Sequence, residues 1–123
     1  MTFEERIYQL ISQIPRGQVT SYGALAAAAS TPRAARVVGS LLRALPRSST
    51  LPWYRVVNAH GMISIENLAI PKAEQARRLQ AEGVWVELKD GNYWVDFRKH
   101  FWTPSSSPPI REANRGRKSG GRN

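Results

Sequence analysis

The sequence predicts a mostly helical fold with a small β component, built as a single winged helix-turn-helix domain. Apolar residues recur at helical spacing through the first 45 residues, whereas after residue 84 they alternate with polar residues as in a strand. Two short helices with a tight connection are expected within the first of these regions, which is the pattern of a helix-turn-helix. Because 123 residues leave room for one domain, we expect residues 1–102 to form it.

The first helix is predicted from its cap and its apolar spacing. Thr2 and Glu5 match a capping box, in which each side chain satisfies the backbone N–H of the other residue. Apolar residues then follow at helical spacing, namely Phe3, Ile7, Leu10, Ile11 and Ile14. Residues 15–17, Pro-Arg-Gly, are expected to end the helix, because they combine a helix breaker with a turn former.

Two further helices are expected before the middle of the chain. The second begins at Ser21 and runs through the alanine-rich residues 24–29. Thr31 and Pro32 are typical of an N-cap followed by proline at the first helical position, so a third helix is predicted to begin there. Pro46 must end this helix, since proline cannot continue it.

Strands and helices are mixed in the rest of the body. Residues 55–58 and 62–64 flank Ala-His-Gly at 59–61, which predicts a tight hairpin or wing. A helix is expected over residues 71–82, with Gly83 as its C-terminal cap.

The end of the body is predicted to hold a second strand pair. Residues 84–88 alternate between apolar and polar, and Asp-Gly-Asn at 90–92 supplies a turn into a strand at 93–95. Asp96 is then expected to cap a last helical turn or two that ends near Trp102.

Residues 103–123 are predicted to form a disordered basic tail. They are rich in Pro, Ser, Gly and Arg, so few of their side chains can be buried to offset the entropy lost on ordering. Five basic residues and one acidic residue give the tail a net charge of +4, and the body keeps +5. The basic character of the body is therefore independent of the tail.

Charge and composition limit the classes of function. The net charge of +9 suits a polyanionic partner, with nucleic acid first and an anionic membrane second, although charge alone also allows a soluble protein with an incidentally high pI. No apolar run is long enough to span a membrane, and the acidic N-terminus predicts no secretory signal. The absence of cysteine excludes disulfides, thiolate metal sites and thiol nucleophiles. With two histidines and scattered carboxylates, we expect no metal and no cofactor.

The third predicted helix has two distinct faces. Its apolar stripe consists of Val37, Val38, Leu41, Leu42 and Leu45, and its opposite face of Arg33, Arg36, Ser40 and Arg43. Three arginines on one face repel one another unless an anion such as a phosphate meets them. The small residues Ala34, Ala35 and Gly39 keep the helix thin enough to approach a duplex closely. DNA contact is the favoured interpretation, and a solvated surface helix is the alternative.

The segment Leu-Pro-Trp-Tyr-Arg-Val-Val at residues 51–57 carries a family resemblance. It resembles the Pro-Cys-His-Arg-Val motif of O6-alkylguanine-DNA alkyltransferases, with Trp53 at the position of the alkyl-accepting cysteine, as in alkyltransferase-like proteins. Residues 17–22 and 33–39 resemble the same family in sequence and in distance from this motif. The resemblance covers residues 2–102, and it implies the alkyltransferase C-terminal type of winged helix-turn-helix.

The resemblance assigns roles to particular residues. Tyr22 would crowd the target phosphate and rotate the nucleotide outward, and Arg36 would fill the space that the base leaves. Arg55 would hold the motif segment in place. Together with the helix-face arginines, the predicted DNA-binding residues are Tyr22, Arg33, Arg36 and Arg43. The predicted lesion pocket, which should open beside the indole toward the arginine-bearing helix, consists of Trp53, Tyr54, Arg55, Ser64, Ile65, Glu66 and Asn67.

The chain departs from the enzymes at Tyr54, where they have a histidine of the network that activates the thiol. We expect a packing role for Tyr54. Structural alternatives remain for two other residues, because Tyr22 is also explained as an aromatic residue at a helix start and Trp53 as a core tryptophan. Trp85, Trp94 and Trp102 are expected in the core, and His60 in an exposed turn.

The function implied by the resemblance is that of a non-enzymatic damage sensor. It would bind O6-alkylguanine in double-stranded DNA, flip the base out without alkyl transfer, and flag it for nucleotide-excision repair proteins. A monomer without membrane association is expected, cytoplasmic and nucleoid-associated in a bacterium or nuclear in a eukaryote. The alternatives are a winged-helix transcription regulator, which leaves residues 52–57 unexplained, and an active alkyltransferase.

Overall fold

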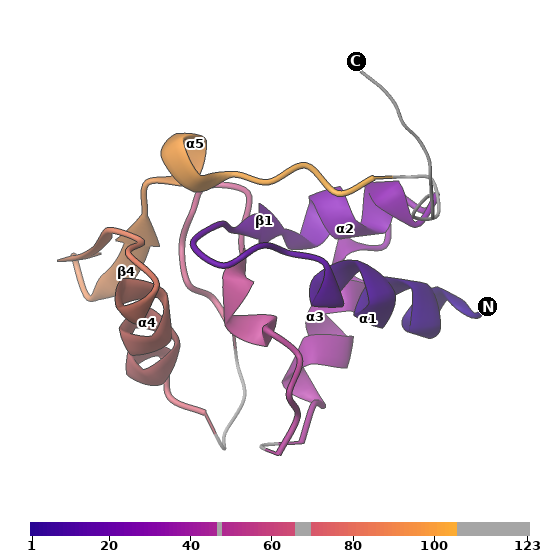
Figure 1. The fold of residues 1–123 in the computed structure, drawn as a ribbon, viewed down its shortest axis with the longest axis horizontal. Coiled ribbons are helices and arrows are strands. Elements are labelled where there is room, and N and C mark those ends of the chain that lie inside the picture. Colours follow the sequence, from indigo (N-terminus) through magenta and orange to yellow (C-terminus); the bar gives the residue numbers. More distant parts are fainter. Residues whose placement is uncertain (47, 66–69, 106–123) are drawn as a thin grey trace.

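The computed structural model describes residues 1–46, 48–65 and 70–105. In these residues the elements are, in order, α1 (Phe3–Ser12), β1 (Thr20–Ser21), α2 (Tyr22–Ala28), α3 (Ala35–Arg43), the 3-10 helix η1 (Trp53–Arg55), β2 (Val56–Val57), α4 (Lys72–Ala81), β3 (Val86–Lys89), β4 (Asn92–Val95) and α5 (Phe97–His100). Figure 1 shows α1, α2 and α3 together at one end, α4 and β4 at the other, and β1 between them. The predicted mostly helical fold with a small β component is confirmed.

Helix α1 begins as its sequence predicts. The Thr2 N–H donates to Glu5 Oε1 at 2.7 Å, and the Glu5 N–H donates to Thr2 Oγ1 at 3.1 Å. These reciprocal bonds are the expected capping box, and they satisfy two N–H groups that the first turn leaves without partners. The apolar stripe of α1 packs into the core through Ile7, Leu10 and Ile11, which are fully buried.

Helix α3 begins later than predicted. The chain ends α2 with a Schellman motif, in which Ser30 has a φ of +66° and the Thr31 N–H donates to the Ala26 carbonyl at 2.9 Å. Thr31 therefore caps the end of α2, and its proposed role as N-cap of α3 is wrong. Residues 31–34 form a turn, closed by the Ala34 N–H on the Thr31 carbonyl at 3.0 Å, and α3 starts at Ala35.

The apolar stripe of α3 is narrower than predicted. Val38 and Leu42 are buried, and Leu41 and Leu45 are half-buried against the same core. Val37 is exposed, so its assignment to the stripe is wrong. Because each residue advances a helix by about 100°, Val37 lies at the edge of the face that Val38 and Leu42 bury.

The expected hairpin around residues 59–61 is replaced by two other pairings. Strand β2 pairs in parallel with β1, with Thr20 opposite Val56. The turn itself exists, since the Gly61 N–H donates to the Asn58 carbonyl at 2.9 Å, but residues 61–63 then lie along β4 instead of folding back on β2. Gly61 permits this approach: at its φ of +87° a Cβ would lie 2.8 Å from the Val95 carbonyl oxygen.

The strand pair near the C-terminus matches its prediction. Strands β3 and β4 are antiparallel, with Val86 opposite Val95 and Lys89 opposite Asn92. Asp90 and Gly91 form the turn with positive φ angles of 52° and 79°, as a two-residue hairpin requires. Helix α4 and its Gly83 cap also follow the sequence, although α4 begins one residue later, at Lys72.

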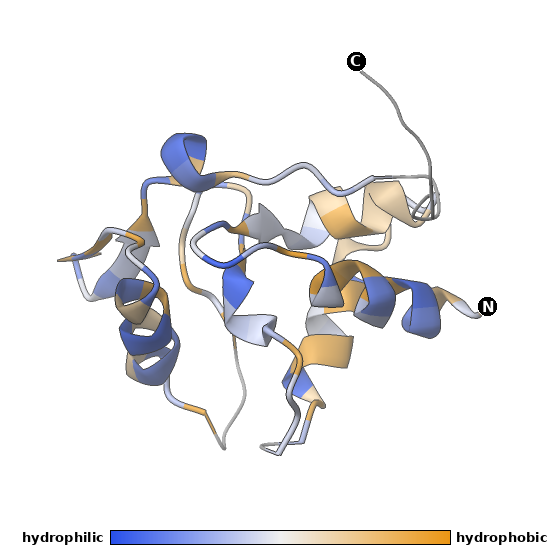
Figure 2. Cartoon of the chain, viewed as in Figure 1, coloured by the Kyte–Doolittle hydropathy of each residue, from blue (hydrophilic) through white to orange (hydrophobic). Residues whose placement is uncertain are grey.

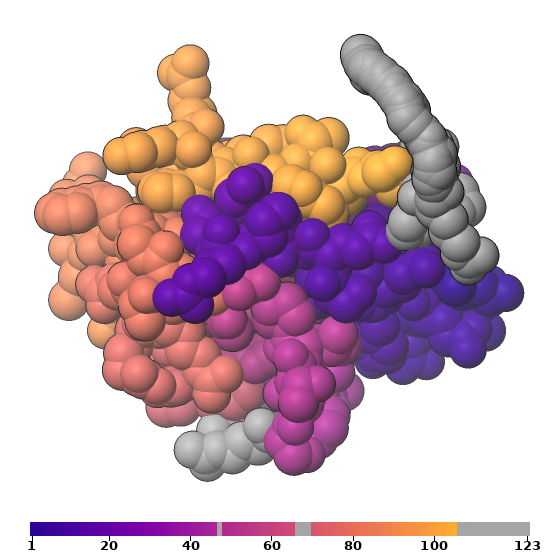
Figure 3. Space-filling view, viewed as in Figure 1, coloured from indigo at the N-terminus to yellow at the C-terminus, as the bar shows by residue number. Residues whose placement is uncertain are grey.

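The chain after α5 binds to the first half of the body. Asp96 caps α5 as predicted, but the helix ends at His100, because Phe101 is extended and the Trp102 N–H donates to the Val19 carbonyl at 2.8 Å. Pro104 is buried, and the Ser105 carbonyl accepts a bond from Arg6 at 3.1 Å. Pro104 and Ser105 thus take part in the described fold, and Figure 3 shows the end of the described chain across the N-terminal part. The rest of the predicted tail lies outside the described residues.

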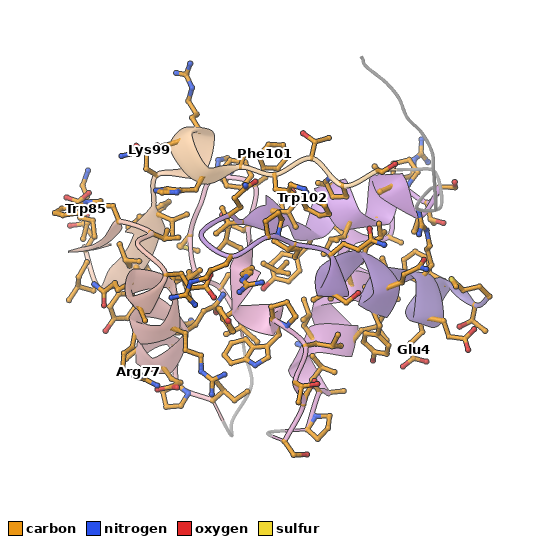
Figure 4. The ribbon with its side chains drawn as sticks, viewed as in Figure 1. Glu4, Arg77, Trp85, Lys99, Phe101 and Trp102 are labelled. Carbon is orange, nitrogen blue, oxygen red and sulfur yellow. The ribbon has the colours of Figure 1, made fainter. Side chains whose placement is uncertain are left out.

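Two buried clusters form the core of the described residues. The first joins α1, α2, α3 and η1 with Ile65 and Ile70, and the second joins Val19 and Ile63 with α4 and β4. Figure 2 shows hydrophobic colouring over α2 and α3 and hydrophilic colouring over α4. Trp85 was expected in the core, but it is 71% exposed and projects from the edge of the molecule (Figure 4). In the described segments no helix has the length and apolar character to cross a bilayer.

Candidate nucleic-acid interface and pocket

A pocket of about 380 Å³ opens on the outward side of α3. The described residues that line it are Tyr22, Ala35, Arg36, Gly39, Ser40, Arg43, Ser64 and Ile65. They come from the start of α2, the polar face of α3 and the segment that follows the turn at 59–61. This volume lies within the range of pockets that bind small molecules.

The α3 side of the pocket is cationic and thin. Arg36 and Arg43 are both exposed there, and no acidic residue is among the described lining residues. Gly39 has no atom within 4 Å of the place that a Cβ would take, so the helix surface is open at this residue. The Arg43 guanidinium donates to Ser40 Oγ at 3.2 Å, which holds it against its own helix. Such a surface favours an anionic partner at close range.

Tyr22 lies at the mouth of this pocket because the local backbone places it there. Ser21 caps α2 by accepting the Ala24 N–H at 3.0 Å, which makes Tyr22 the first helical residue. Tyr22 is half-buried against the first core cluster and also lines the pocket. The structure therefore brings together three predicted DNA-binding residues, Tyr22, Arg36 and Arg43. Arg33 lies outside, on the exposed turn before α3.

Trp53 is not among the described residues that line the pocket. Its side chain is 3% exposed and belongs to the same buried cluster as Ile65, which does line the pocket. The ring meets Tyr54 edge-on, with 5.6 Å between centroids and 88° between planes. The pocket opens toward α3 as expected, whereas the burial of Trp53 is what the core alternative predicts.

Of the other predicted pocket residues, some line the pocket and others do not. Ser64 and Ile65 line the pocket, whereas Tyr54 and Arg55 are absent from the described lining and contact α4 and its C-terminal end. Glu66 and Asn67 lie outside the described residues.

A buried ion pair fixes the motif segment. Arg55 Nε and Nη2 donate to the two carboxylate oxygens of Glu82 at 3.0 and 2.5 Å, and Nη1 donates to the Ile14 carbonyl at 2.7 Å. Glu82 also accepts the Gly17 N–H at 2.9 Å. With side chains only 14% and 3% exposed, Arg55 and Glu82 join η1 to the ends of α1 and α4. Nothing in the sequence indicated that Glu82 pairs with Arg55, because helix α4 lies between the two residues in the chain.

The hydrogen bonds of this network shift the pKa values of Tyr54 and Glu82. The Tyr54 hydroxyl donates to Glu82 Oε2 at 2.7 Å, and burial together with this bond raises the pKa of Tyr54 above its ordinary value. Burial alone would raise the pKa of Glu82, but the bonds from Arg55, Gly17 and Tyr54 outweigh it and lower the pKa. Tyr54 therefore stays protonated beside a carboxylate. Among the described residues no cluster of His, Asp and Glu is arranged to hold a metal ion.

Gln75 is a further positioning residue that the sequence did not reveal. Its side chain is fully buried on α4, and Nε2 donates to the carbonyls of Tyr54 at 3.0 Å and Val56 at 2.9 Å. These bonds satisfy backbone acceptors that the short η1–β2 segment leaves without regular partners. The Gln75 side chain of α4 thus holds the backbone of the motif segment, and the Glu82 side chain at the end of α4 holds the side chains of Tyr54 and Arg55.

Known proteins share this sequence and fold. The family model for the 6-O-methylguanine DNA methyltransferase DNA-binding domain matches residues 2–84. A DNA base-flipping protein of Escherichia coli is 46% identical over 101 residues, which cover 82% of this chain and 74% of that protein. The solved structure of Schizosaccharomyces pombe Atl1 in complex with damaged DNA containing O6-carboxymethylguanine has a TM-score of 0.78 at 32% identity, over 83% of this chain and 95% of that one. The solved structure of Mycobacterium tuberculosis OGT in complex with DNA has a TM-score of 0.55 at 28% identity, over 67% of this chain and 50% of that one.

The ion pair predicts a particular dependence of stability on pH. Glu82→Gln should lower the free energy of unfolding at pH 7 by about 3 kcal/mol, because Arg55 stays buried without its counter-charge. Since the pKa of folded Glu82 lies below its ordinary 4.5, the carboxylate stabilises the fold above that pH, and this contribution is lost as pH falls through the lower folded value.

Urea unfolding between pH 7 and 3 measures the difference between parent and variant, which should shrink below about pH 4.5. Glu74→Gln, which removes an exposed ion-paired carboxylate, is the control and should cost much less at pH 7. A difference that stays constant over the whole pH range would contradict the assignment.

Proposed function

This chain belongs to the O6-methylguanine-DNA methyltransferase family through its DNA-binding domain, and on that premise we propose that it is a non-enzymatic sensor of O6-alkylguanine in duplex DNA. The sensor everts the damaged base without removing the alkyl group. The observation that carries the proposal is the pocket on the cationic face of α3, which joins Tyr22 and Arg36 to Ile65 in a chain without cysteine.

DNA docks on the outward face of α3 in this proposal. Arg33 and Arg43 neutralise phosphates, a contact that releases counterions and weakens steeply with salt. Gly39 and Ser40 leave room for the backbone of a narrow groove. Atl1, the structural relative from S. pombe, has been solved with damaged DNA, and the shared fold supports a DNA partner for this chain.

Eversion of the base rests on the residues at the mouth of the pocket. Tyr22 displaces the phosphate of the target nucleotide, and Arg36 replaces part of the stacking that the base leaves. O6-alkylation already weakens pairing, so the damaged guanine leaves the duplex at a lower cost than an intact one. In the pocket, Ile65 offers an apolar wall and Ser64 a hydroxyl for the base edge. Trp53 backs this wall and is the aromatic surface that the alkyl group approaches.

Alkyl transfer has no acceptor in this site. The reaction needs a nucleophile activated by a base or by a lowered pKa. Trp53 stands where the family has its cysteine, and the raised pKa of Tyr54 keeps its hydroxyl protonated. Recognition therefore ends in a stable complex, whose lesion must be removed by other proteins. We assign removal of the lesion to nucleotide-excision repair proteins. In this proposal the sensor is a monomer, and the repair proteins bind it on cellular DNA.

Two alternatives make different predictions. A winged-helix transcription regulator would prefer one operator sequence. That function does not explain the pocket on the cationic face of α3. An active alkyltransferase would consume its substrate and become alkylated itself. The E. coli relative is named a DNA base-flipping protein, which favours the sensor over both.

Lesion preference is the first test. The parent should bind a duplex with one O6-methylguanine more tightly than the same duplex with guanine, in any sequence context. Tyr22→Ala and Arg36→Ala should each reduce this preference roughly tenfold, because the first removes the side chain that displaces the phosphate and the second removes a stacking contact worth about 1–3 kcal/mol. Fluorescence anisotropy at fixed salt measures both affinities.

Arg33→Ala is the matched control for Arg36→Ala, since it removes the same charge from the turn outside the pocket. It should weaken both duplexes equally and keep the preference. Equal binding of lesion and plain duplex by the parent would overturn the proposed function.

The mass of the protein tests whether transfer occurs. After incubation with excess O6-methylguanine duplex, intact-protein mass spectrometry should find the mass unchanged, because no thiolate is present to accept the methyl group. The M. tuberculosis methyltransferase serves as the positive control. A gain of one CH₂ unit on this chain would identify an enzyme.

The basic tail is proposed to add non-specific DNA affinity through its charge. Deletion of residues 106–123 should make the dependence of log affinity on log salt less steep, by about 0.9 for each phosphate that the tail neutralises in the full-length protein. A full-length variant with Arg111, Arg115, Arg117, Lys118 and Arg122 replaced by Gln is the matched control and should flatten the slope equally. An unchanged slope after deletion would rule out this role.

A further inference from the structure

Arg78 on α4 lies against the aromatic pair of the motif segment. Its guanidinium carbon lies 5.4 Å from the centroid of the Trp53 ring and 5.7 Å from that of Tyr54. Its Nε donates to Glu74 Oε2 at 2.8 Å, one turn back on the same helix. A cation over the face of an indole is attracted by the ring electrons, most strongly where water is excluded. Arg78 is thus a specific partner of Trp53.

Comparison with the neighbouring Arg77 shows that the ion pair with Glu74 alone does not explain why Arg78 lies over the Trp53 and Tyr54 rings. Arg77 binds the same carboxylate, with Nε and Nη2 at 3.0 and 2.6 Å from the Glu74 oxygens. Its side chain is 67% exposed, against 40% for Arg78, and Figure 4 shows it on the outer side of α4. Arg77 makes no stacking contact with the rings of the described chain. One carboxylate therefore holds two guanidinium groups, and Arg78 is the one that lies over the motif aromatics.

Arg78 reaches Trp53 from the side of α4, whereas the pocket is built on the side of α3. None of the described lining residues belongs to α4. Arg78 therefore contacts the indole without lining the pocket, so it does not stand in the path of a base that enters past Tyr22 and Arg36. The carboxylate that holds it stays charged, because hydrogen bonds from Arg77 and Arg78 lower the pKa of Glu74 to about 2.

We propose that Arg78 is a positioning residue that sets lesion selectivity, by holding the Trp53 indole rigid as the back wall of the pocket. The inference rests on the proposed function, since it requires that an everted base reaches the wall that Trp53 backs. A wall fixed before binding spares the complex the entropy of ordering it, so rigidity adds to lesion affinity. Plain DNA, which does not fill the pocket, gains nothing from it.

Arg78→Leu and its twin Arg77→Leu separate this role from general charge. Both variants remove one positive charge and one ion pair with Glu74, but only the first removes the ring contact. Arg78→Leu should reduce the preference for O6-methylguanine over guanine ~3- to 10-fold and leave the affinity for plain duplex within about twofold. Arg77→Leu should keep the parent preference. Arg78→Lys, which retains the charge without the planar guanidinium, should fall between parent and Arg78→Leu.

A second measurement reads the indole in the free protein. The NMR signal of the Trp53 ring N–H, identified by its absence in Trp53→Phe, should shift or broaden in Arg78→Leu and not in Arg77→Leu. All affinities are compared at a temperature at which thermal unfolding shows every variant folded, so that reduced stability does not mimic reduced selectivity.

The outcomes are distinct. A parent without lesion preference overturns the proposed function and this inference together. A parent with preference that Arg78→Leu retains overturns the inference alone. Equal weakening of both duplexes by Arg78→Leu also overturns it, because that result describes a phosphate contact. An unchanged Trp53 signal in Arg78→Leu overturns it as well.

Discussion

The buried pair of Arg55 and Glu82 is the interaction on which the site depends. It joins the 3-10 turn that carries Trp53 and Tyr54 to the Ile14 carbonyl at the end of α1 and to Gly17 in the following turn. A buried charge without its partner is strongly destabilising, so neither residue is dispensable once the other is present. Trp53 and the wall of the pocket keep their places because this pair, with Gln75, fixes the backbone beneath them.

In the proposed function this framework supports binding of the lesion without alkyl transfer. The Tyr54 hydroxyl donates a hydrogen bond to Glu82, a polar contact that the sequence did not predict, and its half-buried ring packs against both core clusters. Buried Arg55 needs that carboxylate as its counter-charge whether or not a nucleophile is nearby. The network therefore also suits a protein that transfers no alkyl group. The feature that the proposed function uses is the surface, where a pocket of about 380 Å³ lies on the cationic face of a thin helix.

Local signals were the part of the fold that the sequence predicted well. The Thr2 capping box, the Asp90-Gly91 turn and the α4 helix need only neighbouring residues, and all three are confirmed. Thr31 was misassigned because an N-cap and a Schellman partner look alike until the path of the chain is known. Glu82 and Gln75 reach the motif from 27 and 19 or more residues away, a distance at which spacing carries no information. The pocket residues Tyr22, Arg36, Ser64 and Ile65 came from family resemblance, whereas the burial of Trp53 matches the core alternative.

A crystal structure of the protein with a duplex containing O6-methylguanine tests the central claim directly. The account predicts the base rotated out of the helix into the pocket between Tyr22, Arg36 and Ile65, its methyl group still attached, and the Arg36 side chain within the base stack. A damaged base that stays stacked in the duplex beside an empty pocket would contradict it.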